Sequence, residues 1–90
     1  MKSIHNKAYQ LLLQLLKTKR NDKGITQEQL ASRLGVGQGI VSKIETHERR
    51  LDVIELREIC LALGISFPEF VTEFDEYLKK EEETKEHEEI

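Results

Sequence analysis

Three glycines stand at alternate positions, Gly35, Gly37 and Gly39, in the middle of a chain of 90 residues. Such spacing occurs in loops that bind phosphate and in tight turns between helices. A dinucleotide-binding loop needs G-x-G-x-x-G directly after a strand. Here the third glycine comes one residue early, and the preceding QEQLASRL has helical spacing. A Walker loop needs a glycine directly before its lysine, but Ser42 precedes Lys43. The glycines therefore predict a turn between two helices.

The residues on both sides of this turn carry the signals of helix starts and ends. Thr26 followed by Gln29 is a capping box, in which each side chain satisfies a free backbone donor. Gly35 predicts the end of that helix, and Ala31 is a small residue where a second helix can approach. Residues 27–46 therefore form a predicted helix-turn-helix. It leaves one face of the later helix toward solvent or DNA, at Gln38, Gly39, Ser42, Lys43 and Thr46.

Helical periodicity continues through the rest of the chain, so we expect an all-α fold with one small core. Asp52 with Glu55, and Ser66 with Glu69, predict further helix starts, and Gly64 predicts an end. The buried face of the fourth helix is predicted at Val53, Leu56, Ile59, Cys60 and Leu63. The expected architecture is a compact five-helix bundle with an extended fifth helix, over residues 3–21, 26–35, 37–46, 52–64 and 66–80.

Charge divides the chain into a basic part and an acidic end. Residues 1–68 contain 11 Lys or Arg against 7 Asp or Glu, whereas residues 69–90 contain 3 against 10. Residues 81–90 have no apolar periodicity, so we expect an acidic, frayed or disordered tail after one domain at residues 1–80. The longest apolar run, residues 11–13, is far too short to span a membrane. This predicts a cytoplasmic protein with no membrane partner.

Residues 24–50, GITQEQLASRLGVGQGIVSKIETHERR, resemble the helix-turn-helix domains of phage repressor and Cro type, the XRE-like regulators. The shared features are the threonine-glutamine opening, the alanine, the turn glycine, the glutamine that begins the later helix and the S-K-I-E run. The following LDVIELREICLALGIS is similar to the closing helices of that family, so the resemblance covers residues 12–72 or so. It implies a lambda repressor-like DNA-binding domain.

The resemblance also implies roles for individual residues. Contacts with DNA base edges are implied for Gln38, Gly39, Ser42 and Lys43. Contacts with DNA phosphates are implied for Gln27, which also braces Gln38, and for Thr46, Arg49 and Arg50. A structural ion pair between the first helix and the recognition helix is implied for Arg20 and Glu45. His47 departs from the pattern, because the family has glycine at this site, which often needs a left-handed backbone.

The chemistry of these side chains agrees with a DNA-reading surface. A glutamine amide offers a donor and an acceptor in one plane, which suits adenine, and lysine can donate to guanine oxygens. Gly39 has two interpretations. Either a helix-weakening residue is simply tolerated there, or its missing side chain clears space for neighbouring side chains to reach the base edges.

The fifth helix has more apolar side chains than the core of so small a domain can accommodate, so we expect part of it to contact a partner. The candidate dimer interface is Phe67, Phe70, Val71, Phe74, Tyr77 and Leu78, packed against Ile4, Ala8, Leu11 and Leu15.

These observations predict a sequence-specific regulator of transcription, a repressor that acts as a homodimer on a palindromic operator in double-stranded DNA. The alternative is an antitoxin, or a restriction-modification controller or adaptor, whose C-terminal aromatic helix binds a toxin or another protein. We expect neither an enzyme nor a cofactor or metal site. His5, His47 and His87 are far apart in the chain, and no nucleophile stands beside them.

Overall fold

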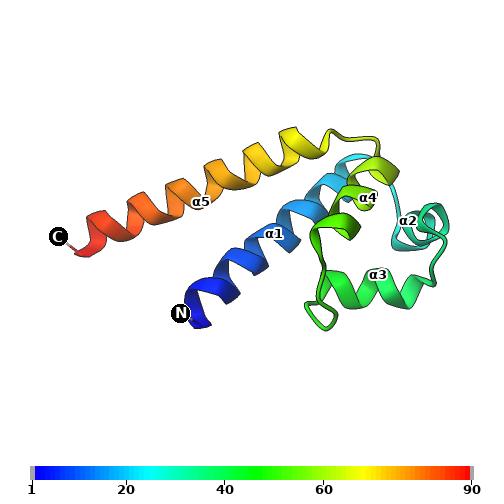
Figure 1. Cartoon of the computed structure of the whole chain (residues 1–90), viewed down its shortest axis with the longest axis horizontal. Coiled ribbons are helices and arrows are strands. Elements are labelled where there is room, and N and C mark those ends of the chain that lie inside the picture. The colour runs from blue at the N-terminus through cyan, green and yellow to red at the C-terminus, as the bar shows by residue number, and fades with distance from the viewer. Residues whose placement is uncertain (1, 90) are drawn as a thin grey trace.

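Five α-helices make up the part of the chain that the structure describes, and that part contains no strand. The computed structural model describes the backbone of residues 2–89 and the side chains of residues 7–83. The predicted all-α class is confirmed. The helices are α1 (Lys2–Asp22), α2 (Gln27–Leu34), α3 (Gln38–Glu45), α4 (Val53–Leu63) and α5 (Phe67–Glu89), as Figure 1 shows.

The helix boundaries follow the local signals in the sequence. At the start of α2 the Thr26 hydroxyl accepts from the Gln29 backbone N–H at 3.1 Å, and the Gln29 side chain accepts from the Thr26 N–H at 2.9 Å. Asp52 and Glu55 form the same reciprocal box at the start of α4. Gly35 ends α2 with φ +72°, a left-handed conformation that glycine adopts without steric cost. The predicted caps of these helices are confirmed.

One apolar core holds the five helices together. α1 packs against α3 and α5, and α4 packs against α2 and α5. Cys60 is fully buried in this core, and burial raises the pKa of its thiol to about 11, so the thiol stays protonated. The buried apolar side chains are Leu13, Leu15, Leu16, Ile25, Leu30, Ala31, Val41, Ile44, Leu56, Ile59, Cys60, Leu63 and Phe70.

The core corrects the sequence prediction for one residue of α4. Val53 was expected on the buried face, but its side chain is 63% exposed, as is that of Ile54. Val53 lies one turn before the buried Leu56, as helical spacing requires. Spacing does not tell how far the neighbouring helices extend, and the first turn of α4 lies beyond the packed region.

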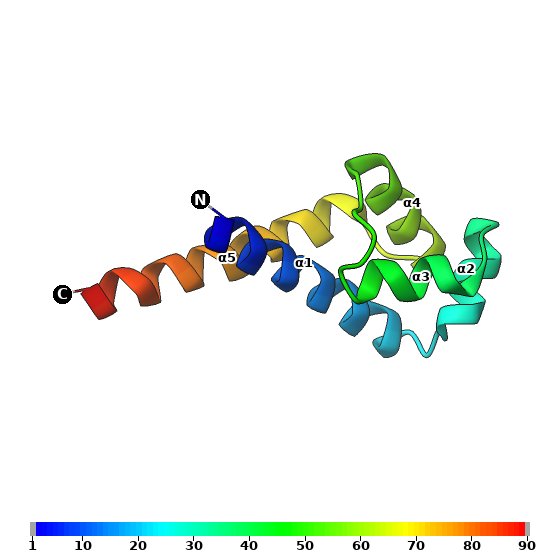
Figure 2. The same cartoon turned by 90° about the horizontal axis from the view of Figure 1, so that it is seen from below.

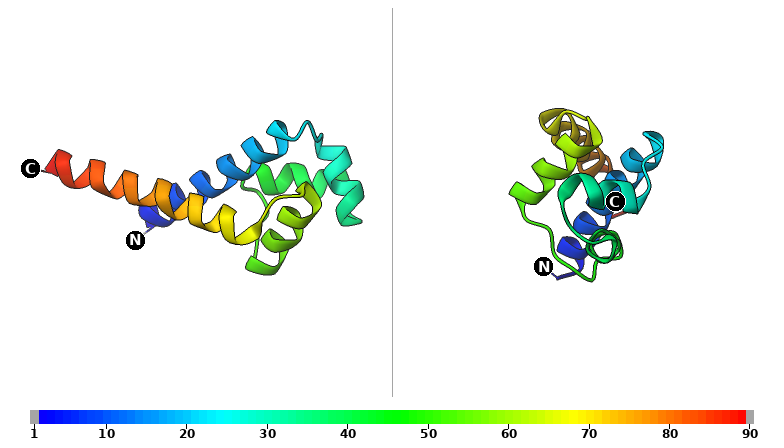
Figure 3. Two further views of the ribbon diagram at one scale, coloured as in Figure 1. Left: turned by 90° about the horizontal axis from the view of Figure 1, so that it is seen from above. Right: turned by 90° about the vertical axis from the view of Figure 1, so that its right-hand side faces the viewer.

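The last helix is longer than the sequence predicted. Residues 81–89 continue α5 as a helix, where we expected fraying or disorder. Glutamate and lysine are good helix formers, and a helix that has already started extends with little cost, so high charge did not end it. In Figures 1 and 3, α5 extends beyond the N-terminal end of α1, and the longest dimension of the molecule is 48 Å.

An ion pair between Lys19 and Glu73 joins α1 to the first half of α5. Their side-chain atoms lie 2.8 Å apart, and this hydrogen bond raises the pKa of Lys19.

None of the described helices is long and apolar enough to cross a membrane.

Candidate nucleic-acid interface

The turn after α2 places α3 with one face in the core and the other outside. After Gly35, the Val36 N–H bonds to the Ala31 carbonyl at 3.0 Å, which reverses the chain. Ala31 is 2% exposed, and Val41 and Ile44 on α3 are also buried. The opposite face of α3 therefore points away from the core, and Figure 2 shows the whole length of this helix at the surface. Gln38, Gly39 and Lys43 on this face are exposed, and Ser42 is half-buried.

Behind this face, a buried ion pair ties α3 to α1. Arg20 donates from Nε and Nη2 to the two carboxylate oxygens of Glu45, at 2.7 and 3.0 Å. Its Nη1 donates to the Ile25 carbonyl at 2.7 Å. The side chains of Arg20 and Glu45 are only 8% and 6% exposed. This paired arrangement satisfies both charges and fixes the position of the Glu45 carboxylate.

The Glu45 carboxylate in turn orients two glutamine amides. Gln27 donates from Nε2 to Glu45 Oε1 at 3.0 Å, and Gln38 donates from Nε2 to Gln27 Oε1 at 3.0 Å. An ionised carboxylate can only accept, so the Gln27 amide nitrogen must face it, and the Gln27 oxygen must face Gln38. Gln38 therefore keeps its oxygen and one N–H for another group. One acceptor and one donor in a plane match the major-groove edge of adenine.

Gly39 and Lys43 extend the open part of this face. A side-chain carbon added at Gly39 would meet no atom within 4 Å, so the space beside Gln38 is empty. The Lys43 ammonium group has no hydrogen-bond or ion-pair partner among the described residues. Both features leave room for an acceptor-rich molecule to approach α3.

Arg49 and Arg50, in the loop after α3, have different partners. The Arg49 Nη2 donates to Glu55 Oε2 at 2.7 Å, which raises the pKa of Arg49 and lowers that of Glu55. The Arg49 Nη1 is buried and has no partner among the described residues. The Arg50 guanidinium carbon lies 5.3 Å from the centre of the Tyr9 ring, and Arg50 is exposed.

Thr46 and His47 form the junction between α3 and this loop. The Thr46 hydroxyl proton is used within the loop, because the Glu48 carboxylate and the Ser42 carbonyl lie 2.7 and 3.0 Å from the Thr46 oxygen. His47 has φ +69°, so the chain adopts the left-handed backbone there without glycine. Such a conformation is uncommon for a residue with a side chain.

Tyr9 on α1 is a residue of this region that the sequence analysis missed. Its hydroxyl accepts the Leu51 backbone N–H at 2.8 Å, across 42 residues of chain. Its ring lies 4.6 Å from that of His47 and beneath Arg50. No sequence pattern could indicate these contacts, because they depend on how the loop folds back onto α1.

The apolar stripe of α5 is divided between the core and the surface. Phe70 is 2% exposed and belongs to the core, so its predicted place in a dimer interface is wrong. Phe67 and Phe74 also pack against the core, whereas Val71 and Tyr77 are 41% and 42% exposed. The sequence could not separate these residues, because helical spacing shows which ones share a face but not how far the core extends.

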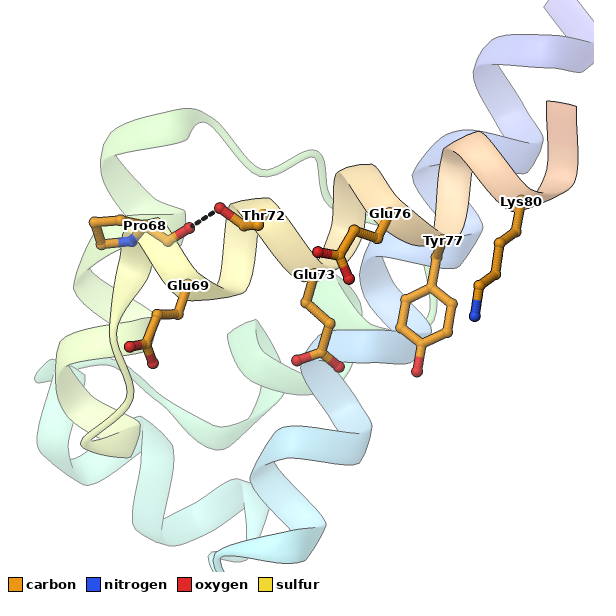
Figure 4. Close-up of a pocket in the computed structure, with 7 residues that line it drawn as sticks. All are labelled: Pro68, Glu69, Thr72, Glu73, Glu76, Tyr77 and Lys80. Carbon is orange, nitrogen blue, oxygen red and sulfur yellow. Dashed lines mark hydrogen bonds between the residues drawn. The ribbon is translucent and has the colours of Figure 1, made fainter. Parts of the chain in front are cut away.

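Tyr77 and Leu78 leave α5 on different sides. Figure 4 shows Tyr77 in one row with Glu69, Glu73 and Lys80. Leu78 lines a groove between α1 and α5 with Ala8 and Leu11, while Leu15 is buried. Ile4, His5 and His87 lie outside the residues whose side chains are described. Exposed apolar side chains that the sequence analysis did not assign to a surface are found on α4, at Val53, Ile54 and Leu61.

Comparison with known proteins places this arrangement in a known group. A family described as Helix-turn-helix matches residues 16–70. An HTH-type transcriptional regulator of Sinorhizobium fredii, named y4dJ and uncharacterized, is 44% identical over 57 residues, which are 63% of this chain and 74% of the relative.

Solved structures share the fold over most of the chain. An XRE-family like protein from Pseudomonas syringae superposes with a TM-score of 0.81 at 46% identity, over 84% of this chain and 93% of the other. The restriction-modification controller protein C.Esp1396I superposes with a TM-score of 0.71 at 28% identity, over 77% of this chain and 91% of the other. The chain thus belongs to the helix-turn-helix family and is a DNA-binding transcriptional regulator of the XRE and Cro type.

Proposed function

We propose that this regulator reads a specific double-stranded DNA sequence with α3 and represses transcription as a homodimer on a palindromic operator. The observation that carries the proposal is the orientation of the Gln38 amide. It stands on the exposed face of α3, and Gln27, Glu45 and Arg20 hold it in one orientation. A side chain whose donor and acceptor are fixed before binding loses little freedom when it contacts a base, which favours selective recognition.

In this proposal Gly39, Ser42 and Lys43 complete the surface that contacts bases. Lys43 supplies a positive charge that can donate to guanine oxygens in the major groove. Gly39 leaves the space into which the edge of a base can enter beside Gln38.

The phosphate contacts are assigned to the edges of the same surface. Arg50 is exposed, and nothing among the described residues accepts a hydrogen bond from it, so its N–H groups are available to phosphate oxygens. The backbone N–H groups at the start of α2, beside Gln27, and at the start of α3 also favour phosphate, because the N–H groups at a helix N-terminus can donate to an anion. Thr46 and Arg49 have partners within the protein, so their contacts require these partners to be exchanged or shared.

A homodimer is proposed because one unit of this size contacts few base pairs. Two copies whose recognition helices lie about 34 Å apart, one turn of DNA, would read both halves of a palindrome. The apolar side chains available for the contact are Val71, Tyr77 and Leu78 on α5, with Ala8 and Leu11 on α1. We propose that the dimer acts in the cytoplasm by covering a promoter.

A second function is favoured by one of the structural neighbours. The similarity to the restriction-modification controller protein supports a role as a controller of that kind. In this alternative, which also includes an antitoxin, α5 would bind another protein. A restriction enzyme or toxin encoded next to this chain would support that alternative.

The proposal is tested by titrating Gln38→Ala against a selected site and against random DNA. We expect a loss of about 1 to 3 kcal/mol of binding free energy on the selected site and no change on random DNA, because the amide contacts bases. Arg50→Ala is the matched comparison, since the loss of a phosphate contact should weaken binding to both DNAs about equally. A Gln38→Ala protein that binds the selected site as well as wild type would rule out this reading surface.

A further inference from the structure

Tyr9 contacts three residues of the loop between α3 and α4. Its hydroxyl accepts the backbone N–H of Leu51 at 2.8 Å, its ring packs on the ring of His47, and the Arg50 guanidinium lies over the same ring. Figures 1 and 2 show this loop beside α1, the helix that carries Tyr9. One half-buried side chain therefore contacts the first residue and the last two residues of the loop, residues 47–51.

These contacts hold the loop near both of its ends. The His47 backbone is left-handed at φ +69°, a conformation that needs support from its surroundings when the residue is not glycine. The bond to Leu51 fixes the other end of the loop directly before α4 starts. Arg50 lies between these two anchored residues.

The contact with Tyr9 leaves the Arg50 donors free for another ligand. A cation–π contact uses the face of the aromatic ring and consumes none of the guanidinium N–H groups as hydrogen-bond donors to an oxygen. Arg49 differs, because its Nη2 already donates to Glu55. Arg50 is therefore the arginine of this loop that is both held in place and able to bind an anion.

We propose that Tyr9 is a positioning residue for DNA binding, which holds Arg50 where it can contact a phosphate. The inference rests on the proposed function, since it assigns to Tyr9 the preorganisation of a contact that Arg50 makes. It adds a residue of α1 to the DNA-binding surface, although Tyr9 itself touches no DNA in this account. An arginine held in place before binding loses less side-chain freedom when the phosphate arrives.

The test is a double-mutant cycle between Tyr9 and Arg50, measured as affinity for random duplex DNA over a series of salt concentrations. In the wild-type background Arg50→Ala should reduce the salt slope by about 0.9, the value of one phosphate contact. In the Tyr9→Leu background Arg50→Ala should cost less, by a factor of about two to five in affinity, because an exposed cation–π contact has about that strength. Tyr9→Phe keeps the ring but loses the bond to Leu51, so it should restore most of the effect of Arg50→Ala.

Gln38→Ala provides the matched control, because Gln38 is held by Gln27 and not by Tyr9. On the selected site its effect should be the same with Tyr9 or Leu at position 9. Urea unfolding of each variant gives the folded fraction, by which the affinities are corrected. Equal effects of Arg50→Ala with Tyr9 and with Tyr9→Leu would overturn the inference. If Arg50→Ala changes neither affinity nor salt slope in the wild-type background, the phosphate contact in the proposed function is itself wrong.

Discussion

Gln38 and Gly39 are neighbours on the outer face of α3, and they contribute in opposite ways to the fold. Gln38 takes part in a hydrogen-bonded chain that ends at the buried Arg20, so its position is fixed by the protein. Gly39 lies within the helix, where it destabilises the helix relative to alanine. Nothing lies within 4 Å of where its side chain would be, so packing does not explain why glycine is there. Two interpretations remain: glycine is simply tolerated there, or its missing side chain clears space at the proposed DNA surface.

We therefore expect Gly39→Ala to separate stability from DNA affinity. The substitution should raise the free energy of unfolding by about 1 kcal/mol, because alanine is the better helix former and no clash occurs. Affinity for the selected DNA site should fall, since the methyl group enters the space beside Gln38. Urea unfolding and fluorescence anisotropy measure the two effects.

Gly35→Ala is the matched control for this prediction. Gly35 has φ +72°, so alanine there should destabilise the protein by about 1 kcal/mol or more. If Gly39→Ala binds the selected site as tightly as wild type does, the glycine is merely tolerated and has no role in the interface.

The sequence predicted contacts between residues far apart in the chain only where a family resemblance supplied the register. Arg20 and Glu45 are 25 residues apart, and no local pattern links them, yet the resemblance paired them, and the structure shows the ion pair. The contacts of Tyr9 and the ion pair of Arg49 with Glu55 could not be foreseen. They depend on the path of the loop in three dimensions, and spacing along the chain does not show that path.

Helix starts and ends were the most predictable part of the fold. The capping boxes at Thr26 and Asp52 and the left-handed glycines act over three or four residues, so their signals are complete in the sequence. The extent of the core was less predictable, because it depends on where neighbouring helices end. This is why Val53 is exposed and Phe70 is buried, against both expectations.

The buried ion pair between Arg20 of α1 and Glu45 of α3 gives a prediction about stability. Arg20→Met leaves the Glu45 carboxylate buried without its cation, and we expect a loss of about 3 to 5 kcal/mol in the free energy of unfolding. The double variant Arg20→Met with Glu45→Met should recover most of this loss, because no buried charge remains. Urea unfolding measures both variants.

The same two variants distinguish the two roles of this ion pair, which are to hold α1 against α3 and to orient Gln27. The double variant lacks the acceptor that orients Gln27, so it should discriminate the selected site from random DNA less well than wild type does. An Arg20→Met protein as stable as wild type would show that the ion pair does not hold α1 and α3 together.

Across the whole molecule, the acidic C-terminal part of α5, residues 81–89, lies far from the outer face of α3. Figures 1 and 2 place the C-terminal end of α5 at the opposite end of the molecule from α2 and α3. Negative charge close to DNA phosphates would oppose binding, so this separation is what a DNA-binding surface on α3 requires.

The proposed homodimer depends on where the exposed apolar side chains lie relative to α3. One copy presents a single α3, and the apolar side chains offered for the dimer are the exposed Val71 and Tyr77 of α5 and the half-buried Leu78, Ala8 and Leu11 of α5 and α1. A dimer formed through them would leave both recognition helices free, and two-fold symmetry in the protein would be matched by an inverted repeat in the DNA.

Selection of binding sites from a pool of random duplexes by the purified full chain tests the central claim most directly. We predict enrichment of one inverted repeat whose half-site centres lie about 34 Å apart, one turn of the double helix. The repeat should place an adenine in each half-site where Gln38 reaches the major groove. A pool that remains random after repeated selection would contradict sequence-specific recognition by this protein.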